Sequence, residues 1–178
     1  MTEIICAGFG GQGILTTGMM IINAGMESGK NVCWYPSYGS EMRGGTANCN
    51  VKINDGKIAS PYYKNVDVLF TMNGPAIDKF EDIIKSGGYL LVNSSIVDEN
   101  RKYRNDINVV KVPAMELAAK VGNAKGSNIV MLGALVKATK IFGKDQFSDA
   151  MCNYFEKKGK GKFNPKNIEA YEAGFNAV

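Results

Sequence analysis

The sequence contains no histidine, and this absence excludes several kinds of active site. Serine and cysteine nucleophiles are commonly activated by a neighbouring histidine, so such an arrangement is either missing here or shared with another chain. Zinc sites that use histidine ligands are excluded for the same reason. Any chemistry in which this chain takes part must use other side chains or other subunits.

Cysteine is scarce and widely spaced. The chain has four, and no two of them form a C-x-x-C pair: Cys6, Cys33, Cys49 and Cys152. This spacing excludes ferredoxin-type iron–sulfur loops, zinc ribbons and thioredoxin chemistry. Cys6 and Cys33 lie in apolar runs, so we expect them in the core. For Cys49, a structural place on a strand or loop and a reactive thiol are the two alternatives.

The sequence also lacks a long apolar run. No stretch approaches the roughly 18 residues that a membrane helix needs, and the segment around Glu3 lacks the basic residues of a signal peptide. We therefore expect no membrane association and a cytoplasmic location, which the unpaired cysteines also favour. A length of 178 residues, with 45% hydrophobic residues and no internal repeat, predicts one domain over residues 1–178.

The net charge of +4 is concentrated in one segment. Residues 157–166 (KKGKGKFNPK) contain five lysines and no acid, which leaves −1 on the other 168 residues. A nucleic-acid-binding surface needs a broad basic face, so we expect no nucleic-acid partner. A solvated loop is the ordinary interpretation of such a run. A contact for an acidic partner or a phosphate-bearing ligand is the alternative.

Apolar patterning predicts an alternation of strands and helices. The expected strands are Glu3–Phe9, Asn31–Tyr35, Thr46–Asn54, Asp67–Met72, Gly88–Ser95 and Ile107–Val112. The expected helices are Ile14–Ser28, 74–85, 113–121, Ser127–Phe142, Asp145–Lys158 and Asn164–Ala177, the last two packing on the outside. This order predicts an α/β fold, a three-layer Rossmann-like domain with a mostly parallel central sheet and a β-hairpin after the second strand.

Local signals set several of these boundaries. Asn54-Asp55-Gly56 is a hairpin turn signal, which places a short returning strand at Lys57–Ser60. Pro36 is expected to stop the second strand. The segment Ser127–Phe142 has the pattern of a strongly amphipathic helix, with Ser127 as its N-cap and a glycine at its end.

The first loop with chemical information is Gly8-Phe9-Gly10-Gly11-Gln12-Gly13. It follows a predicted strand, opens a helix and matches G-x-G-x-x-G, a pattern in which a helix N-terminus meets an anion. The alternative is that the glycines only permit close packing. Dinucleotide sites place an acid after the second strand, where this chain has Tyr35-Pro36-Ser37. The lysine of an ATP-binding P-loop is absent as well, so neither NAD nor ATP is favoured.

The second such loop, residues 37–46, follows the second strand and should reach the same carboxyl edge of the sheet. It holds an aromatic residue, an acid, a methionine and an arginine between glycines (SYGSEMRGGT). An arginine such as Arg43 can bind a phosphate or carboxylate with two hydrogen bonds, because its guanidinium group is planar. Alternatively, Arg43 forms an ion pair with Glu41 that has only a structural role, and the sequence favours the two interpretations equally.

Both loops together resemble a known family. GxGGQG after the first strand and SYGxEMRGGT after the second are similar to the gamma subunit of 2-oxoacid:ferredoxin oxidoreductases, and so is the N-x-x-x-L-G-A segment that begins at Asn128. The same domain occurs within single-chain pyruvate:ferredoxin oxidoreductases. The resemblance covers nearly the whole chain, although Ser40 stands where relatives often have proline or alanine.

The resemblance implies a subunit of an enzyme that oxidatively decarboxylates a 2-oxoacid, joins the acyl group to coenzyme A and passes electrons to ferredoxin. Thiamine diphosphate, Mg and 4Fe–4S clusters are implied in alpha, beta and possible delta partner subunits. This chain is expected to bind no cofactor alone, to be inactive alone and to contribute to the coenzyme A site. The substrate stays open among 2-oxoglutarate, branched-chain 2-oxoacids, pyruvate and aryl pyruvates.

The family motifs map onto two sets of residues that we expect to face the active site or the alpha/beta interface. They are Gly8, Gly10, Gly11, Gln12 and Gly13 in the first loop and Tyr38, Glu41, Met42, Arg43, Gly44, Gly45 and Thr46 in the second. No catalytic or metal-ligating role is assigned to any of them. The alternative function is a stand-alone Rossmann-type nucleotide-binding module, and nucleic-acid binding ranks last.

Overall fold

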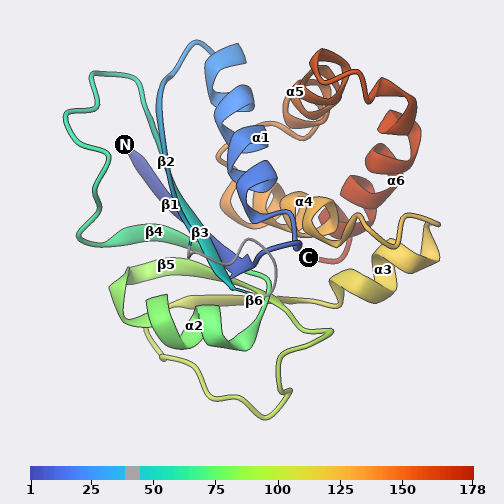
Figure 1. The fold of residues 1–178 in the computed structure, drawn as a ribbon. Helices are drawn as coiled ribbons and strands as arrows, with labels where there is room; N and C mark the ends of the chain where they lie inside the picture. Colours follow the sequence, from blue (N-terminus) through green and yellow to red (C-terminus); the bar gives the residue numbers. More distant parts are fainter. Residues whose placement is uncertain (39–44) are drawn as a thin grey trace.

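A six-stranded sheet forms the centre of the computed structural model, which describes residues 1–38 and 45–178. The strands are β1 (Thr2–Phe9), β2 (Asn31–Tyr38), β3 (Thr46–Asn54), β4 (Val66–Thr71), β5 (Ile84–Asn93) and β6 (Asn108–Val112). Their order in the sheet is β2-β3-β1-β4-β5-β6. Only β3 is antiparallel to its neighbours, and the β1-β4-β5-β6 part is parallel throughout (Figure 1).

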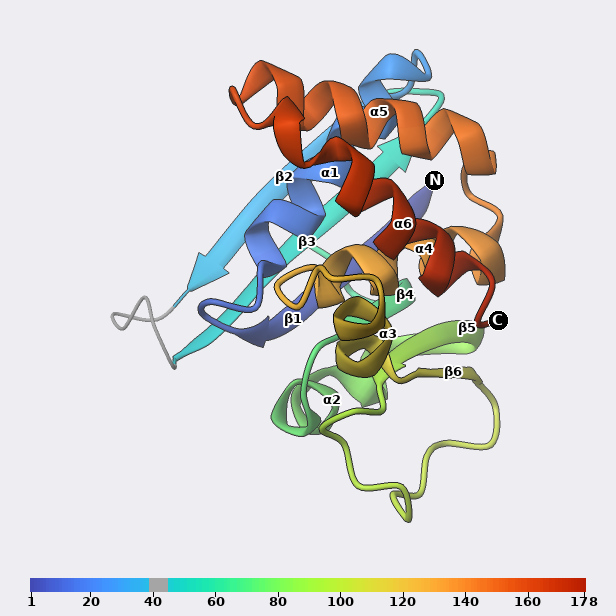
Figure 2. The same ribbon diagram turned by 90° about the vertical axis from the view of Figure 1, so that its right-hand side faces the viewer.

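Helices cover both faces of this sheet. They are α1 (Ile14–Glu27), α2 (Gly74–Phe80), α3 (Ala114–Lys120), α4 (Ser127–Thr139), α5 (Lys144–Lys157) and α6 (Asn164–Phe175), with short 3₁₀ helices at Glu81–Ile83 and Gly161–Phe163. The helices α1 and α4–α6 lie on one side and α2 lies on the other (Figures 1 and 2). The predicted three-layer α/β fold is therefore confirmed.

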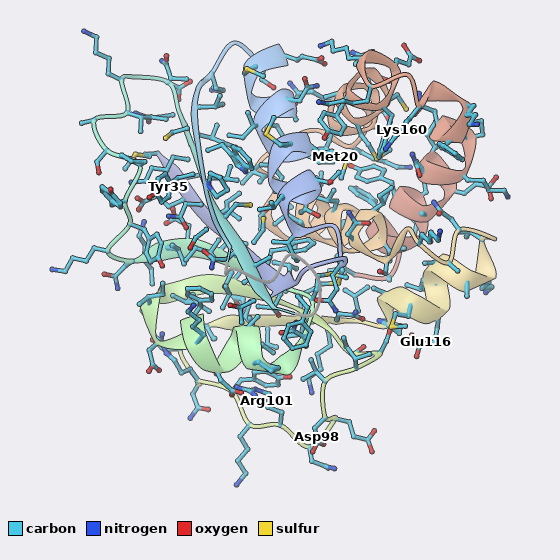
Figure 3. The ribbon with its side chains drawn as sticks, viewed as in Figure 1. Met20, Tyr35, Asp98, Arg101, Glu116 and Lys160 are labelled. Carbon is cyan, nitrogen blue, oxygen red and sulfur yellow. The ribbon has the colours of Figure 1, made fainter. Side chains whose placement is uncertain are left out.

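Alternation along β1 builds the two halves of the core, because neighbouring side chains of a strand point to opposite faces. Ile4 and Cys6 belong to the large cluster under α1 and α4–α6, whereas Ile5 and Ala7 belong to the smaller cluster under α2. Figure 3 shows the same division, with Met20 of α1 on the side of α1 and α4–α6 and Tyr35 of β2 directed away from that side. Tyr35 stays 42% exposed.

The hairpin is formed by β2 and β3 themselves. Pro36 does not stop β2, which continues to Tyr38 with Pro36 opposite Cys49. Proline is tolerated there because β2 is an edge strand and its second side needs no ladder hydrogen bonds. The expected return strand at Lys57–Ser60 is wrong, since these residues have no regular structure. The side chain of Asn54 instead closes a local turn by donating to the carbonyl of Gly56 (3.1 Å).

Two helix boundaries also differ from the expectation. The helix that was expected to reach residue 85 ends at Phe80, because Ile84 already pairs with Val66 at the start of β5. Ser127 is the first helical residue of α4, and Gly126 occupies the N-cap position. The helix α4 then ends at Thr139 rather than Phe142, and Phe142 packs on Phe147 of α5 with ring centroids 5.6 Å apart.

The helix α4 is buried almost all round instead of being amphipathic. Its residues from Asn128 to Val136 are all buried. Glycines let α6 approach it closely: a Cβ on Gly133 would lie 2.0 Å from the Tyr171 carbonyl oxygen, and one on Gly174 would lie 1.7 Å from the Val130 carbonyl oxygen. The expected outer position therefore holds for α5 and α6. The helix α4 lies between α6 and the sheet, and α5 packs mainly on α1 (Figure 2).

Candidate functional site

The glycine-rich turn connects β1 to α1 at the carboxyl edge of the sheet. Gly11 and Gly13 have positive φ angles of 98° and 75°, which favour glycine strongly over other residues. Gly13 is also the N-cap of α1, where no side chain accepts a hydrogen bond and the first turn contains no acidic residue. The N-terminal N–H groups of α1 therefore keep their capacity to bind an anion.

Gln12 holds this turn in place. Its side-chain Oε1 accepts hydrogen bonds from the Phe9 backbone N–H (2.7 Å) and from Asn73 Nδ2 (3.0 Å), and its Nε2 donates to the Met72 carbonyl (3.3 Å). Asn73 in turn caps α2 by accepting from the Ala76 N–H (3.0 Å). Gln12 thus joins the end of β1 to the segment that follows β4, and its role in the described structure is to position the turn.

Asn128 supports the turn from the other side, although the sequence reasoning gave it no role. Its Nδ2 donates to Thr17 Oγ1 (3.3 Å) and to the Gly13 carbonyl (3.5 Å). A Cβ on Gly13 would lie 2.6 Å from that same nitrogen, so Gly13 leaves the space that Asn128 occupies. The N-x-x-x-L-G-A segment was the sequence signal that could have indicated this role. Its asparagine is Asn128, and its glycine is Gly133, which lets α6 pack closely on α4.

The two predicted loops meet. The Gly10 N–H donates to the Gly45 carbonyl (2.9 Å), and Phe9 lies opposite Thr46 in the β1–β3 ladder. The β2–β3 hairpin therefore ends beside the glycine-rich turn, as its place after the second strand predicted. Tyr38 is the last residue of β2. The predictions for the Tyr38 side chain and for Glu41, Met42, Arg43 and Gly44 lie outside the described residues.

A cavity of about 490 Å³ opens between the glycine-rich turn and the hairpin. Gly10, Gly11 and Gly13 form its polar backbone side, and Leu15, Trp34 and Pro36 contribute the apolar side. Such a mixture suits an elongated ligand with an apolar part and an anionic or amide-bearing part, because ligand sites combine apolar walls with a few backbone donors.

Two of the four cysteines, Cys6 and Cys49, are core residues. Cys6 and Cys49 lie opposite each other in the β1–β3 ladder and both are 0% exposed. Contact with Cys49 and burial raise the pKa of the Cys6 thiol. Cys49 lies under α1, where a Cβ on Gly18 would be 2.4 Å from its Sγ. The structural alternative for Cys49 therefore holds. The expectation of a core position for Cys33 is wrong, because Cys33 lies on the edge strand β2 and is only half-buried.

The lysine-rich segment is not a free loop. Its residues form the end of α5, a 3₁₀ helix and the start of α6. Lys157 pairs with Glu27 of α1 (3.2 Å) and Lys166 pairs with Glu169 (2.7 Å). Part of the positive charge is therefore paired, between α5 and α1 at Lys157 and within α6 at Lys166.

Across residues 1–38 and 45–178 there is no group of three acidic or cysteine side chains arranged to hold a metal ion. The same residues contain no helix that is long and apolar enough to cross a membrane.

The comparison with protein families assigns the chain to a family. Residues 3–177 match the family described as pyruvate ferredoxin/flavodoxin oxidoreductase. The chain belongs to this family. Within it, the ketoisovalerate oxidoreductase subunit VorA of Methanothermobacter thermautotrophicus is 38% identical over 168 residues, which are 94% of this chain and 34% of VorA. The 2-oxoglutarate synthase subunit KorC of Methanocaldococcus jannaschii is 33% identical over 178 residues, covering 99% of this chain and 93% of KorC.

Solved structures of family members have the same fold. A keto/oxoacid ferredoxin oxidoreductase gamma subunit from Geobacter sulfurreducens PCA aligns with a TM-score of 0.82 at 28% identity, over 99% of this chain and 98% of that one. A 2-oxoglutarate:ferredoxin oxidoreductase from Magnetococcus marinus, with 2-oxoglutarate, coenzyme A and succinyl-CoA bound, aligns with a TM-score of 0.86 at 26% identity. It covers 99% of this chain and 30% of the Magnetococcus chain.

These likenesses confirm the resemblance to gamma subunits of 2-oxoacid:ferredoxin oxidoreductases. The chain spans about a third of the length of VorA and of the Magnetococcus enzyme chain, and nearly all of KorC. It is therefore similar both to a separate small subunit and to one part of longer chains.

The alternative of a Rossmann-type dinucleotide module fits the sheet less well. In dinucleotide-binding folds the strand after the first helix lies beside the first strand and ends in an acidic residue near the glycine-rich turn. In this family member β3 lies between β1 and β2, pairing along both. The end of β2 is thus one strand further from the turn, and β2 contains no acid.

Proposed function

We propose that this chain is the gamma-type part of a multisubunit 2-oxoacid:ferredoxin oxidoreductase, with residues 1–178 acting as one domain. The enzyme oxidatively decarboxylates a 2-oxoacid, transfers the acyl group to coenzyme A and passes the electrons to ferredoxin. The family match over residues 3–177 supports this proposal most strongly. The likeness to a separate gamma subunit over 98% of that chain supports a subunit role.

In this proposal the partner subunits carry the redox chemistry. Alpha and beta subunits, with a delta subunit where present, hold thiamine diphosphate, Mg and the 4Fe–4S clusters, and the assembled enzyme works in the cytoplasm. The gamma-type chain docks on them and is inactive alone. Its sequence and described structure offer backbone donors, an open helix end and an apolar wall, which are suited to shaping a binding surface.

Coenzyme A is the group whose chemistry fits the cavity at the glycine-rich turn. The open start of α1 suits its phosphates, and the apolar side at Leu15 and Trp34 suits its uncharged arm. When bound, coenzyme A supplies the thiol that accepts the acyl group. We assign Gly8, Gly10, Gly11, Gln12, Gly13, Gly45 and Thr46 to this face, together with Tyr38, Glu41, Met42, Arg43 and Gly44 of the adjoining loop.

Co-expression tests the subunit role. Alpha and beta partners from the same source are produced with and without this chain, and coenzyme A-dependent reduction of ferredoxin is measured with 2-oxoglutarate, 2-oxoisovalerate, pyruvate and indolepyruvate. We expect no activity from this chain alone, and activity with one substrate class when all subunits are present. Full activity of the partners without this chain would contradict the proposal. Saturable NAD binding by the isolated chain would favour the nucleotide-module alternative instead.

A further inference from the structure

A second cavity, of about 360 Å³, lies on the other side of the start of α1. The first turns of α4 and α6 and the connection between α5 and α6 surround it, and Gly13 borders both this cavity and the one described above. Figure 3 shows Lys160 at the connection between α5 and α6. The proposed function does not use this cavity.

The charge around this second cavity is positive. Lys125, Lys160 and Lys166 line it, and among the residues that the structure describes no carboxylate does. Lys166 has an ion-pair partner in Glu169. For Lys125 and Lys160, the ion pairs among residues 1–38 and 45–178 provide none. Lysines brought together without acids repel one another, and a bound anion removes that repulsion.

Two helix ends face the same cavity with the same polarity. The 13-residue helix α4 begins at Ser127 with no side-chain cap and no acidic residue in its first turn. The 12-residue helix α6 also lacks a side-chain cap and has Lys166 in its first turn, where a positive charge opposes the helix dipole. An anion at this point would bind free N–H groups at the start of α4. At α6 the Asn164 N–H already donates to the Gly161 carbonyl and Pro165 has no N–H, so there the anion would only offset the unfavourable placement of the lysine.

A buried side chain independently indicates a missing acceptor. Asn167 lines the cavity and is only 5% exposed. Its Oδ1 accepts a hydrogen bond from Asn123 Nδ2 (3.1 Å), whereas its own Nδ2 has no partner among the described residues. A buried amide donor without an acceptor costs stability, so such groups in native proteins are usually met by water or a ligand oxygen.

We propose that this cavity binds the phosphate group of a phosphomonoester, with Lys125 and Lys160 as its charged ligands. Phosphate suits the site because it carries two charges near neutral pH and several acceptor oxygens for lysine, amide and helix N–H donors. Phe163 also lines the cavity and is 50% exposed. Its ring, with Lys162 Nζ 5.1 Å from the centroid, offers apolar surface for contact with a base. A nucleotide monophosphate is therefore the favoured ligand class. This inference goes beyond the proposed function and does not depend on it.

Calorimetric titration of the full chain tests this site with three probes: AMP, inorganic phosphate and adenosine. We expect saturable binding of AMP and of phosphate, with AMP the tighter, and none of adenosine. The K125Q/K160Q variant should bind AMP at least about tenfold more weakly, since two charge-assisted contacts are lost. The K57Q/K64Q variant is the charge-matched control, because Lys57 and Lys64 are exposed residues outside the cavity.

Each outcome of the titrations either supports the phosphate site or contradicts it. Equal affinity for phosphate and AMP keeps the phosphate site and identifies free phosphate as its ligand. No saturable binding of either probe, or unchanged binding by K125Q/K160Q, overturns the proposal. An equal loss in K57Q/K64Q would also overturn it, because the effect would then follow from net charge. Thermal unfolding of both variants verifies that they fold. A failure of the co-expression test leaves these outcomes unaffected.

Discussion

The glycine-rich turn between β1 and α1 and the contact between α4 and α6 use the same residue type for different physical reasons. In the turn, Gly11 has a positive φ angle and nothing within 4 Å of the place where a Cβ would stand. In the helix contact, Gly174 is helical, and a Cβ there would meet backbone at 1.7 Å. Gly11 allows a backbone conformation with positive φ at an open surface, and Gly174 allows two helices to pack closely inside the core.

Because of this difference, a substitution in the turn should mainly affect ligand binding, whereas one in the helix contact should mainly affect stability. A side chain added in the turn projects into open space beside the proposed coenzyme A site. A side chain added in the helix contact must push two helices apart, because neither carbonyl nor helix backbone can move away locally. Substitutions in the two regions should therefore affect different measurements.

The largest effect is expected at the helix contact. Replacing Gly174 by alanine places a methyl group against the Val130 carbonyl and should lower the free energy of unfolding by about 3 kcal/mol or more, at the upper end for overpacked cores. Urea unfolding of the isolated chain measures this loss. The matched control is Gly74→Ala, since Gly74 has an ordinary φ angle and open space around it. A Gly174→Ala protein as stable as the control would show that the helices can separate freely.

A smaller effect is expected where side chains, rather than close packing, hold the structure. Gln12→Ala removes three hydrogen bonds that position the turn and should cost about 2 kcal/mol of unfolding free energy. A double-mutant cycle with Asn73→Ala should give a coupling of about 1 kcal/mol. Gln146→Ala is the control, because Gln146 also makes two hydrogen bonds but is exposed. If the losses of unfolding free energy at Gln12 and Asn73 were additive, the two side chains would not stabilise the turn as one hydrogen-bonded unit.

The strands and the turn could be predicted because their signals are local. Continuous apolar runs locate β1 and β4, and a glycine cluster between a strand and a helix indicates a turn with positive φ angles. The wrong return strand at Lys57–Ser60 had a local turn signal too. It failed because β3 already finds a partner on each side, in β1 and β2, and leaves no free edge.

The supports of the candidate site could not be predicted because they are long-range. Asn128 reaches Gly13 across 115 residues of sequence, and Asn73 reaches Gln12 across 61. The pattern of α4 could not show that α6 would cover its second face, since that depends on Gly133 meeting Tyr171, which is 38 residues further along the chain. The sequence therefore identified the glycine-rich turn, and the structure was needed for the residues that hold it.

The smallest change in stability should be the most informative about function. Gly11 in the turn and Gly29 at the other end of α1 both have positive φ angles, 98° and 71°, and both have open space around the missing Cβ. Alanine at either position should therefore cost a similar amount, about 1 kcal/mol, from backbone strain alone. In the assembled oxidoreductase, Gly11→Ala should raise the KM for coenzyme A several-fold, and Gly29→Ala should leave it unchanged. Equal KM values for the two variants would remove the glycine-rich turn from the coenzyme A site, because the strain is matched and only the position differs.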